Sequence, residues 1–254
     1  MAKIKVKFNM VRAAYPFFAG QTLKWLSSDG EETYAHNLKK SSTRNLLEEL
    51  GWIDSDITYN INRHGFRSEE FRATDNGIMF LGCSYTSGIG LPEQDTFARL
   101  VADNLEMNLL NLSKAAGSAD TCFRIGSYWM PILKPKIVVC ITPAMNRWEW
   151  VDSVGNAVDS LMSTIPRVWF TRDENQLFNR QKNILALKYI AIENNIKFVE
   201  YPSEKIFLAY DQDTDTPREL RGDLARDLLH PGRKTHQLAA KNIIEAIDDN
   251  KTEH

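Results

Sequence analysis

A hydroxyl, a carboxylate and an imidazole occur in this chain in an order that supports nucleophilic catalysis. Ser84 lies in the stretch GCSYTSG directly after the apolar run IMFLG, and Asp227 and His230 lie in DLLHPG near the C-terminus. A serine hydroxyl is a weak nucleophile until a base removes its proton, and a carboxylate orients the imidazole that removes it. These residues predict acyl transfer with His230 as the base and Asp227 as its partner. The nucleophile is Ser84 or the adjacent Cys83, since successive residues at a strand end point to opposite sides.

The tetrahedral intermediate of acyl transfer needs hydrogen-bond donors for its oxyanion, and three candidates follow the predicted strands. They are the N–H of Ser84, the N–H of Gly117 in NLSKAAGSAD and the side-chain amide of Asn146 in ITPAMNRWEW. Gly117 equally suits a turn that needs a positive φ. The oxyanion hole is therefore predicted at Ser84, Gly117 and Asn146, with the structural reading of Gly117 left open.

Two other residues compete for the acid and base roles. Asp223 precedes Asp227 in the same polar stretch, and His236 follows His230 by six positions. His236 shares the apolar face of the predicted last helix, which favours packing over catalysis. Asp227 is favoured over Asp223 because it lies three residues before His230. A further cluster, Arg147, Trp148 and Trp150, either lines a substrate cleft or covers the core.

These residues must be positioned by alternating strands and helices. Strands are predicted at 78–82, 107–113, 136–143 and 196–202, with a short one at 206–210, and helices at 91–105, 118–133, 175–195 and 233–250; the stretch 144–174 is predicted to be irregular with at most one short helix. Alternation of this kind implies right-handed crossovers between parallel strands. The predicted fold is a three-layer α/β/α sandwich of the flavodoxin-like type with a mostly parallel central sheet. Sites in such folds lie at the carboxyl ends of the strands.

Residues 1–76 differ in texture from residues 77–254, which form the predicted α/β domain. The stretch 24–40 is polar and predicted to be a loop, 41–52 a short helix, and 59–71 a mixed segment leading into the first core strand. We expect residues 1–76 to be an extension packed on the core. Within this extension, three polar residues are expected either to tie the extension to the core or to reach the rim of the cleft. They are Asn62, His64 and Arg67.

The chain resembles the SGNH (GDSL-type) hydrolase family over roughly residues 77–250. GCSYTSG matches the first block, GDSxTxG, at every fixed position except the Asp, which is replaced by Cys83; NLSKAAGS fits the second block and DLLHP fits the fifth, DxxHP. The third block, GxND, is represented by AMNR, which has Asn146 but neither the Gly nor the Asp. The resemblance selects Ser84 over Cys83 as nucleophile. It implies the triad Ser84, His230 and Asp227 and assigns oxyanion donation to Ser84, Gly117 and Asn146.

The resemblance implies a serine esterase whose substrate is a small-molecule or carbohydrate O-acyl ester or a lipid ester. The weak third block motivates the alternative of an inactive SGNH-like binding or structural protein, including a virion protein. Neither metal nor cofactor is expected. A net charge of −2 predicts no nucleic-acid partner, and three cysteines without CxxC spacing favour a reducing compartment. The sequence shows no signal peptide and no membrane span, which predicts a cytoplasmic or phage-delivered protein; it does not specify an oligomeric state.

Overall fold

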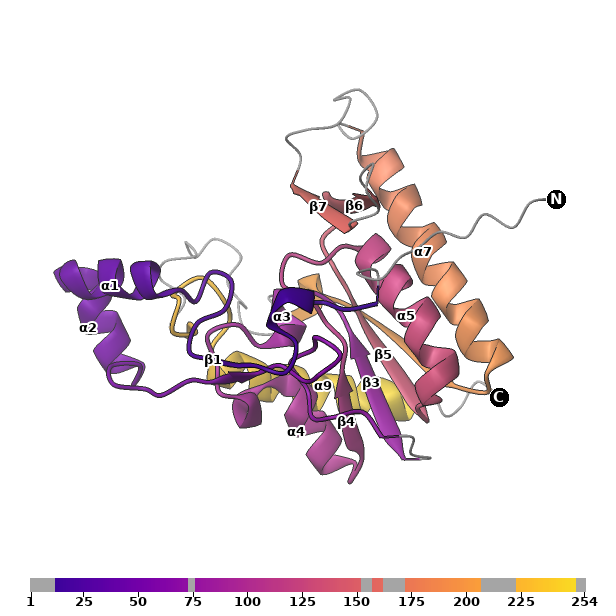
Figure 1. The fold of residues 1–254 in the computed structure, drawn as a ribbon, viewed down its shortest axis with the longest axis horizontal. Helices are drawn as coiled ribbons and strands as arrows, with labels where there is room; N and C mark the ends of the chain where they lie inside the picture. The colour runs from indigo at the N-terminus through magenta and orange to yellow at the C-terminus, as the bar shows by residue number, and fades with distance from the viewer. Residues whose placement is uncertain (1–11, 73–75, 152–156, 162–171, 207–222, 250–254) are drawn as a thin grey trace.

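The centre of the molecule is a parallel four-stranded sheet with the strand order β4-β3-β5-β8 (Figure 1). A computed structural model describes residues 12–72, 76–151, 157–161, 172–206 and 223–249. The four strands pair in parallel throughout. Their bounds are β3 (Gly77–Leu81), β4 (Asn108–Asn111), β5 (Ile137–Thr142) and β8 (Lys197–Pro202). The predicted strands at 78–82, 107–113, 136–143 and 196–202 are thus confirmed.

Helices cover both faces of this sheet. One face carries α5 (Ala119–Leu133) and α7 (Asp173–Glu193), and the other carries α4 (Phe97–Asn104) and α9 (Arg233–Asp249) (Figure 1). Alternate residues of one strand enter different clusters: Met79 packs with the α5 and α7 side chains, whereas Phe80 packs with those of α4 and α9. This alternation places a core on each face, and the predicted three-layer α/β/α architecture is confirmed.

The helix predicted at 91–105 is shorter than expected. Residues Glu93–Asp95 form a 3₁₀ turn (η2), and α4 begins at Phe97 after Thr96, whose hydroxyl accepts a hydrogen bond from the Arg99 N–H. Threonine is a good N-cap residue because its oxygen satisfies a first-turn donor, so the helix starts there rather than at Pro92. The other three predicted helices are found within two residues of their expected bounds.

The prediction that 144–174 is irregular is wrong for its first part. The strands β6 (Arg147–Val151) and β7 (Ala157–Leu161) form an antiparallel hairpin. The strand β6 has only a short stretch of alternating residues. Trp148 is buried, and the next residue, Glu149, forms an ion pair with Arg124 of α5. Residues 162–171 lie outside the described part of the chain. Of the predicted strand at 206–210, Ile206 is helical and the rest lies outside the described residues.

The N-terminal segment contains more helix than predicted. The stretch 24–40, expected to be a loop, contains α1 (Glu31–Lys39), and α2 (Ser41–Glu49) confirms the predicted short helix. Acidic residues in the first turn of α1 and basic residues in its last turn suit the helix dipole. The remaining elements here are η1 (Pro16–Phe18), β1 (Thr22–Leu23) and β2 (Tyr59–Asn60), the last two paired antiparallel.

This segment shares its core with the sheet. Trp52, Ile57 and Phe66 are almost fully buried and belong to the same apolar cluster as Met79 and Leu81 of β3. The division of the chain at residue 76 stays a prediction. Within the described ranges, no helix combines the length and apolar character needed to cross a bilayer.

Candidate functional site

The turn after β3 is a tight strand-to-helix junction that places Ser84 at the start of a short helix. Cys83 is the N-cap of α3 (Ser84–Ser87), and Gly88 ends this helix in the left-handed conformation with φ 66°. A Cβ at Gly82 would overlap the Thr86 hydroxyl and lie 3.2 Å from the Cβ of Ile141. Only glycine therefore allows the chain to turn this sharply.

Ser84 itself is 5% exposed and its Oγ forms no hydrogen bond with any residue in the described part of the chain. Its N–H belongs to the first turn of α3, where backbone donors lack an intrahelical acceptor. Cys83 is buried at 2% exposure beside it. The two adjacent candidates are thus both enclosed, and Ser84 is the one that begins the helix.

The C-terminal loop 223–232 contacts this turn. The Arg226 N–H donates to the Gly90 carbonyl at 3.0 Å, and the Tyr85 and His230 rings meet edge to face with their centroids 5.6 Å apart. Tyr85 directly follows Ser84, so the imidazole lies beside the turn that carries the serine. The structure brings the Ser84 turn and His230 together without a hydrogen bond between Ser84 Oγ and the imidazole.

Asp227 and His230 form a close pair. His230 Nδ1 lies 2.6 Å from Asp227 Oδ2, and Asp227 Oδ1 accepts hydrogen bonds from the Leu229 and His230 N–H groups, each at 3.1 Å. The carboxylate has no exposed side-chain surface. A carboxylate can only accept, so the shared proton resides on Nδ1 and leaves Nε2 as the lone-pair nitrogen. That tautomer is the one a general base requires.

The environment of Asp227 keeps its carboxylate charged. Burial alone would raise its pKa, but the hydrogen bond and charge of His230, the Ser28 hydroxyl and the Leu229 N–H together lower the pKa below its ordinary value. An ionised partner of this kind fixes the ring and stabilises the imidazolium that forms during proton transfer.

The loop that holds the pair is closed on itself by backbone hydrogen bonds. The Ala225 N–H donates to the His230 carbonyl at 2.9 Å, and the Gly232 N–H donates to the Asp223 carbonyl at 3.0 Å. Leu228 lies in the left-handed region with φ 55°, which costs a non-glycine residue roughly 1–2 kcal/mol. Leu228 is strained within the turn in which several hydrogen-bond donors point at the Asp227 carboxylate.

The two competing residues have structural roles. Asp223 Oδ2 accepts hydrogen bonds from the Thr235 N–H at 2.7 Å and from its hydroxyl at 2.8 Å, at the start of α9. His236 is 1% exposed, accepts from the Phe97 N–H and stacks on the Phe97 ring. Burial and, to a smaller extent, the nearby charges of His230 and Arg67 lower the pKa of His236 to about 3. His236 is therefore a neutral packing residue.

Gly117 lies close to the Ser84 turn but its N–H is engaged elsewhere. That N–H donates to the Lys114 carbonyl at 2.9 Å, and a Cβ at Gly117 would lie 3.1 Å from the Gly82 carbonyl oxygen. The alternative that Gly117 supplies a positive φ is wrong, because the left-handed residue of this turn is Ala116 with φ 59°. Gly117 instead allows two loops to approach closely at the sheet edge.

Asn146 lies in the turn before β6 and is exposed. It forms no hydrogen bond with the described residues. Trp148, two positions on, is 4% exposed, so it does not form an open aromatic platform. The side chain of Trp150 is outside what the structure describes.

The polar group of the N-terminal segment serves attachment. Arg67, 2% exposed, donates to the carbonyls of Ser87, Gly88 and Leu91 around the end of α3. Asn62 accepts hydrogen bonds from neighbouring backbone N–H groups within its own loop. Arg67 therefore ties the N-terminal segment to the core, as one of the two interpretations expected.

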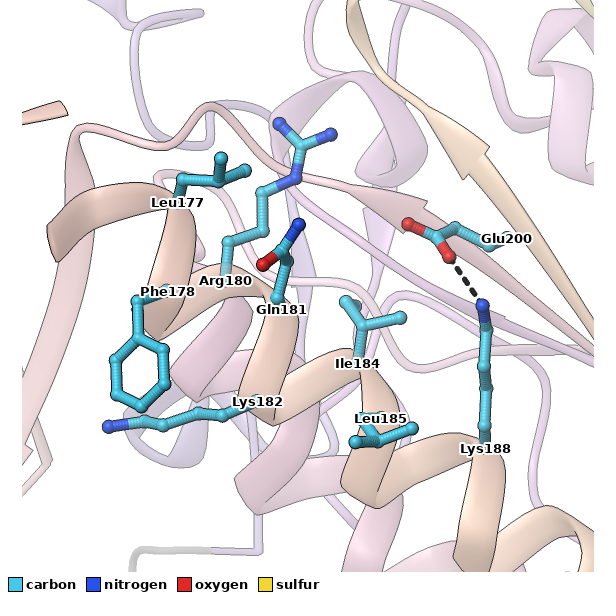
Figure 2. A pocket seen from close by; sticks show the side chains of 9 residues that line it. All are labelled: Leu177, Phe178, Arg180, Gln181, Lys182, Ile184, Leu185, Lys188 and Glu200. Atoms are coloured by element: carbon cyan, nitrogen blue, oxygen red, sulfur yellow. Dashed lines mark ion pairs between the residues drawn. The ribbon is translucent and has the colours of Figure 1, made fainter. Parts of the chain in front are cut away.

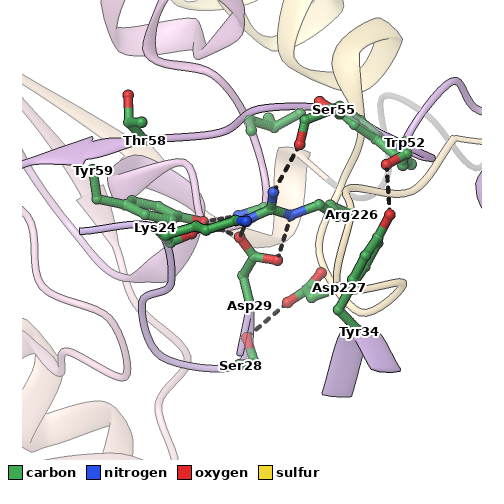
Figure 3. Close-up of polar contacts among 12 residues, drawn as sticks. Lys24, Ser28, Asp29, Tyr34, Trp52, Ser55, Thr58, Tyr59, Arg226 and Asp227 are labelled. Atoms are coloured by element: carbon green, nitrogen blue, oxygen red, sulfur yellow. Dashed lines mark hydrogen bonds and ion pairs between the residues drawn. The ribbon is translucent and has the colours of Figure 1, made fainter. Parts of the chain in front are cut away.

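Sequence reasoning missed one residue that touches the Asp227–His230 pair. The Ser28 hydroxyl donates to Asp227 Oδ2 at 2.7 Å (Figure 3). It also lies 3.4 Å from His230 Nδ1. Ser28 lies in a stretch predicted to be a loop, and nothing in its sequence context pointed to a contact with residues 199 positions away.

A separate cavity of about 560 Å³ lies over α7 and β8 (Figure 2). Its wall combines Phe178 and Leu185 with Arg180 and the ion pair between Lys188 and Glu200. None of the predicted catalytic residues lines it. Among the described residues, no group of three or more His, Cys, Asp or Glu is arranged to hold a metal ion.

Comparison with known proteins gave no match to a family model and none to a curated protein. Solved structures that resemble the chain include several esterases, a putative acylhydrolase and a putative lipolytic protein of the G-D-S-L family. The esterase EstA from Pseudoalteromonas is 15% identical with a TM-score of 0.39, covering 69% of this chain and 98% of that one. The acetyl xylan esterase Est2A from Butyrivibrio proteoclasticus is 12% identical with a TM-score of 0.45, covering 72% and 66%. At TM-scores below 0.5, the chemistry of this chain rests on its own residues.

Proposed function

We propose that the protein is a serine hydrolase that cleaves an ester through an acyl-enzyme on Ser84. The observation that carries the proposal is the Asp227–His230 pair, with Nδ1 and Oδ2 2.6 Å apart, beside the turn that presents Ser84. A carboxylate that holds the imidazole in this tautomer leaves Nε2 free to accept a proton, which is what a general base must do.

In the first half of the proposed reaction, Ser84 Oγ attacks the ester carbonyl carbon while His230 Nε2 takes the hydroxyl proton. The carbonyl π electrons move onto oxygen. Collapse of the tetrahedral intermediate breaks the bond to the alcohol oxygen, which leaves with the proton from Nε2. In the second half, water attacks the acyl carbon while Nε2 takes its proton. Collapse of the second tetrahedral intermediate breaks the bond between the acyl carbon and Ser84 Oγ, Oγ takes the proton back from Nε2, and the carboxylic acid is released.

The N–H of Ser84 is the first proposed donor to the oxyanion, because it lies in the first turn of α3. Gly117 and Asn146 remain proposals for the second and third donors. The Gly117 N–H would have to leave the Lys114 carbonyl, and the exposed Asn146 side chain would have to turn toward Ser84.

The proposed substrate is an O-acyl ester of a small molecule or carbohydrate, or a lipid ester. Two of the structural neighbours are named acetyl xylan esterases, but their TM-scores of 0.45 and 0.35 carry no argument about the acyl group or the alcohol. The buried Trp148 gives no support for a sugar, because it offers no open ring face. A short acyl group on a simple alcohol is therefore the substrate to test first.

The test is hydrolysis of p-nitrophenyl acetate and labelling by a fluorophosphonate probe. Wild-type protein is expected to hydrolyse the ester and to be labelled, whereas Ser84→Ala loses both, with kcat falling about 10³-fold or more. Cys83→Ala is the matched control and retains much of the activity. A folded wild type that is inert toward both reagents would sink the enzyme proposal, and loss in Cys83→Ala alone would transfer the nucleophile to the thiol.

A binding or structural role without catalysis is the second candidate. It is favoured by the absence of a hydrogen bond between Ser84 Oγ and His230, and by the exposed position of Asn146. Catalytic hydrogen bonds are often completed only when substrate binds. The labelling experiment separates the two candidates, since a binding protein leaves the serine unreactive.

A further inference from the structure

The turn Leu26–Asp29 of the N-terminal segment meets the loop that carries the catalytic pair. We infer that Ser28 is a positioning residue for Asp227 and His230, and that the N-terminal segment thereby completes the active site. This inference rests on the proposed function for its consequence in catalysis. Its geometry is independent of that function, because it concerns how one carboxylate is held.

Ser28 reaches the same oxygen that His230 uses. Asp227 Oδ2 accepts from the Ser28 hydroxyl at 2.7 Å and from His230 Nδ1 at 2.6 Å, while Oδ1 accepts from two backbone N–H groups. The backbone donors belong to the catalytic loop itself. Ser28 is the donor that comes from another part of the chain, so it fixes the carboxylate relative to the body of the molecule.

Ser28 is held in place by its neighbour. Asp29 forms a two-point ion pair with Arg226, with Nε–Oδ1 at 2.9 Å and Nη2–Oδ2 at 2.7 Å, and both side chains are 1% exposed (Figure 3). Tyr59 donates to the Asp29 carboxylate as well. The dipeptide Ser28-Asp29 therefore faces the dipeptide Arg226-Asp227, and the buried pair sets the position from which the serine donates.

The turn is closed so that Ser28 has little freedom. Leu26 and Asp29 exchange backbone hydrogen bonds at 3.0 and 3.2 Å, and the guanidinium of Arg226 also donates to the carbonyls of Lys24 and Ser55. These contacts bind both ends of the turn to the catalytic loop. Without the hydroxyl of Ser28, Oδ2 would lose one of two donors, and the carboxylate could rotate away from Nδ1.

Kinetics of three variants test the inference. Ser28→Ala is expected to lower kcat for p-nitrophenyl acetate about 10–100-fold with KM nearly unchanged, the usual cost of losing a residue that orients a site group. Ser28→Thr keeps a hydroxyl and is expected to recover most of kcat. Ser27→Ala, an exposed serine in the same turn, is the matched control and should match wild type. Equal kcat for Ser28→Ala and wild type would overturn the inference.

A spectroscopic measurement tests it without activity. A proton held between His230 Nδ1 and Asp227 Oδ2 at 2.6 Å should give a far-downfield ¹H resonance, assigned by its loss in His230→Gln. In Ser28→Ala this resonance is expected to move upfield and exchange faster with water, and in Ser28→Thr to stay. An unchanged resonance in Ser28→Ala would overturn the inference. An inert wild type with a resonance that responds to Ser28 would instead sink only the proposed function.

Discussion

At the residue scale, the proposed chemistry depends on one carboxylate that is buried and yet ionised. Asp227 collects four hydrogen bonds, from Ser28, the ring and backbone of His230, and the Leu229 N–H. A charge removed from water is tolerated only where hydrogen bonds replace the lost solvation. The number of donors therefore explains how Asp227 can sit without exposed surface and still hold the imidazole.

Asp227→Asn is expected to lower kcat for p-nitrophenyl acetate by about 10³–10⁴-fold, because a neutral amide no longer specifies the tautomer with a free Nε2. The measurement is steady-state hydrolysis by wild type and variant. Asp223→Asn is the control: its carboxylate binds Thr235 at the start of α9, so stability falls while kcat is largely kept. If Asp223→Asn lost more kcat than Asp227→Asn, the carboxylate partner of His230 would be Asp223 and the assignment to Asp227 would be wrong.

Asp227 also predicts a pH dependence of stability. Its pKa is lowered in the folded protein, so its contribution is present above the unfolded pKa of about 4 and is lost as pH falls through the lower folded value. The difference in free energy of unfolding between wild type and Asp227→Asn should be largest above about pH 5 and shrink below about pH 4. Urea titrations at several pH values check this. A difference that grows on acidification would contradict it.

The sequence predicts the pair Asp227 and His230, because both lie in one short loop and their spacing is local. It does not predict Ser28, because that contact joins residues 199 positions apart and depends on where the turn Leu26–Asp29 is packed. For Gly117, the sequence predicts the position but not the direction of the N–H. Its place near the Ser84 turn follows from the strand order, but the direction of its N–H depends on the loop conformation around Ala116.

At the element scale, the site depends on how sharply β3 turns into α3. Gly82→Ala would bring a Cβ onto the Thr86 hydroxyl and within 2.9 Å of the Thr86 Cβ. We expect a loss of about 1–3 kcal/mol in the free energy of unfolding, the range for overpacking a close contact, together with reduced activity because Ser84 is displaced. Urea denaturation and p-nitrophenyl acetate hydrolysis measure the two effects.

Thr86→Ala provides the compensating change for that prediction. The Thr86 hydroxyl is buried and has no hydrogen-bond partner among the described residues, so Thr86→Ala alone should cost only the roughly 1 kcal/mol of a lost buried methyl group. In the double variant with Gly82→Ala, part of the lost stability should return because the overlapping oxygen is gone. If the double variant is no more stable than Gly82→Ala, the overlap with Thr86 is not what requires glycine.

The elements of the sheet follow from sequence better than those around it. Strands such as β5, buried on both faces, read as continuous apolar runs, and α5 opens with the Ser118 cap that its sequence shows. The helix α1 and the hairpin β6–β7 lack such patterns. The side chains of α1 are mostly polar, and Glu149 of β6 is matched to Arg124 of α5, a partner that is set by tertiary packing.

At the scale of the whole molecule, the N-terminal segment and the α/β core are joined by apolar packing and by one fully buried ion pair. Trp52 and Phe66 share a cluster with β3, and Trp52 Nε1 donates to the Leu224 carbonyl at 2.7 Å. Asp29 and Arg226 are 1% exposed. Since the loop 223–232 that carries Asp227 and His230 is part of this junction, we expect the N-terminal segment and the core to unfold in one transition.

Arg226→Met is the change that tests this junction. It leaves the Asp29 carboxylate buried without its cation, and breaking a buried pair in this way costs about 3–5 kcal/mol. Arg226→Met combined with Asp29→Asn removes the stranded charge and should recover part of the loss. Urea unfolding followed by tryptophan fluorescence and by far-UV circular dichroism measures both variants. The exposed pair Arg63–Glu70 supplies the control: Arg63→Met should change stability by less than about 1 kcal/mol. Separate transitions for the two probes in wild type would contradict the expectation that segment and core unfold together. An Arg226→Met variant as stable as Arg63→Met would show that the N-terminal segment is held on the core by other contacts.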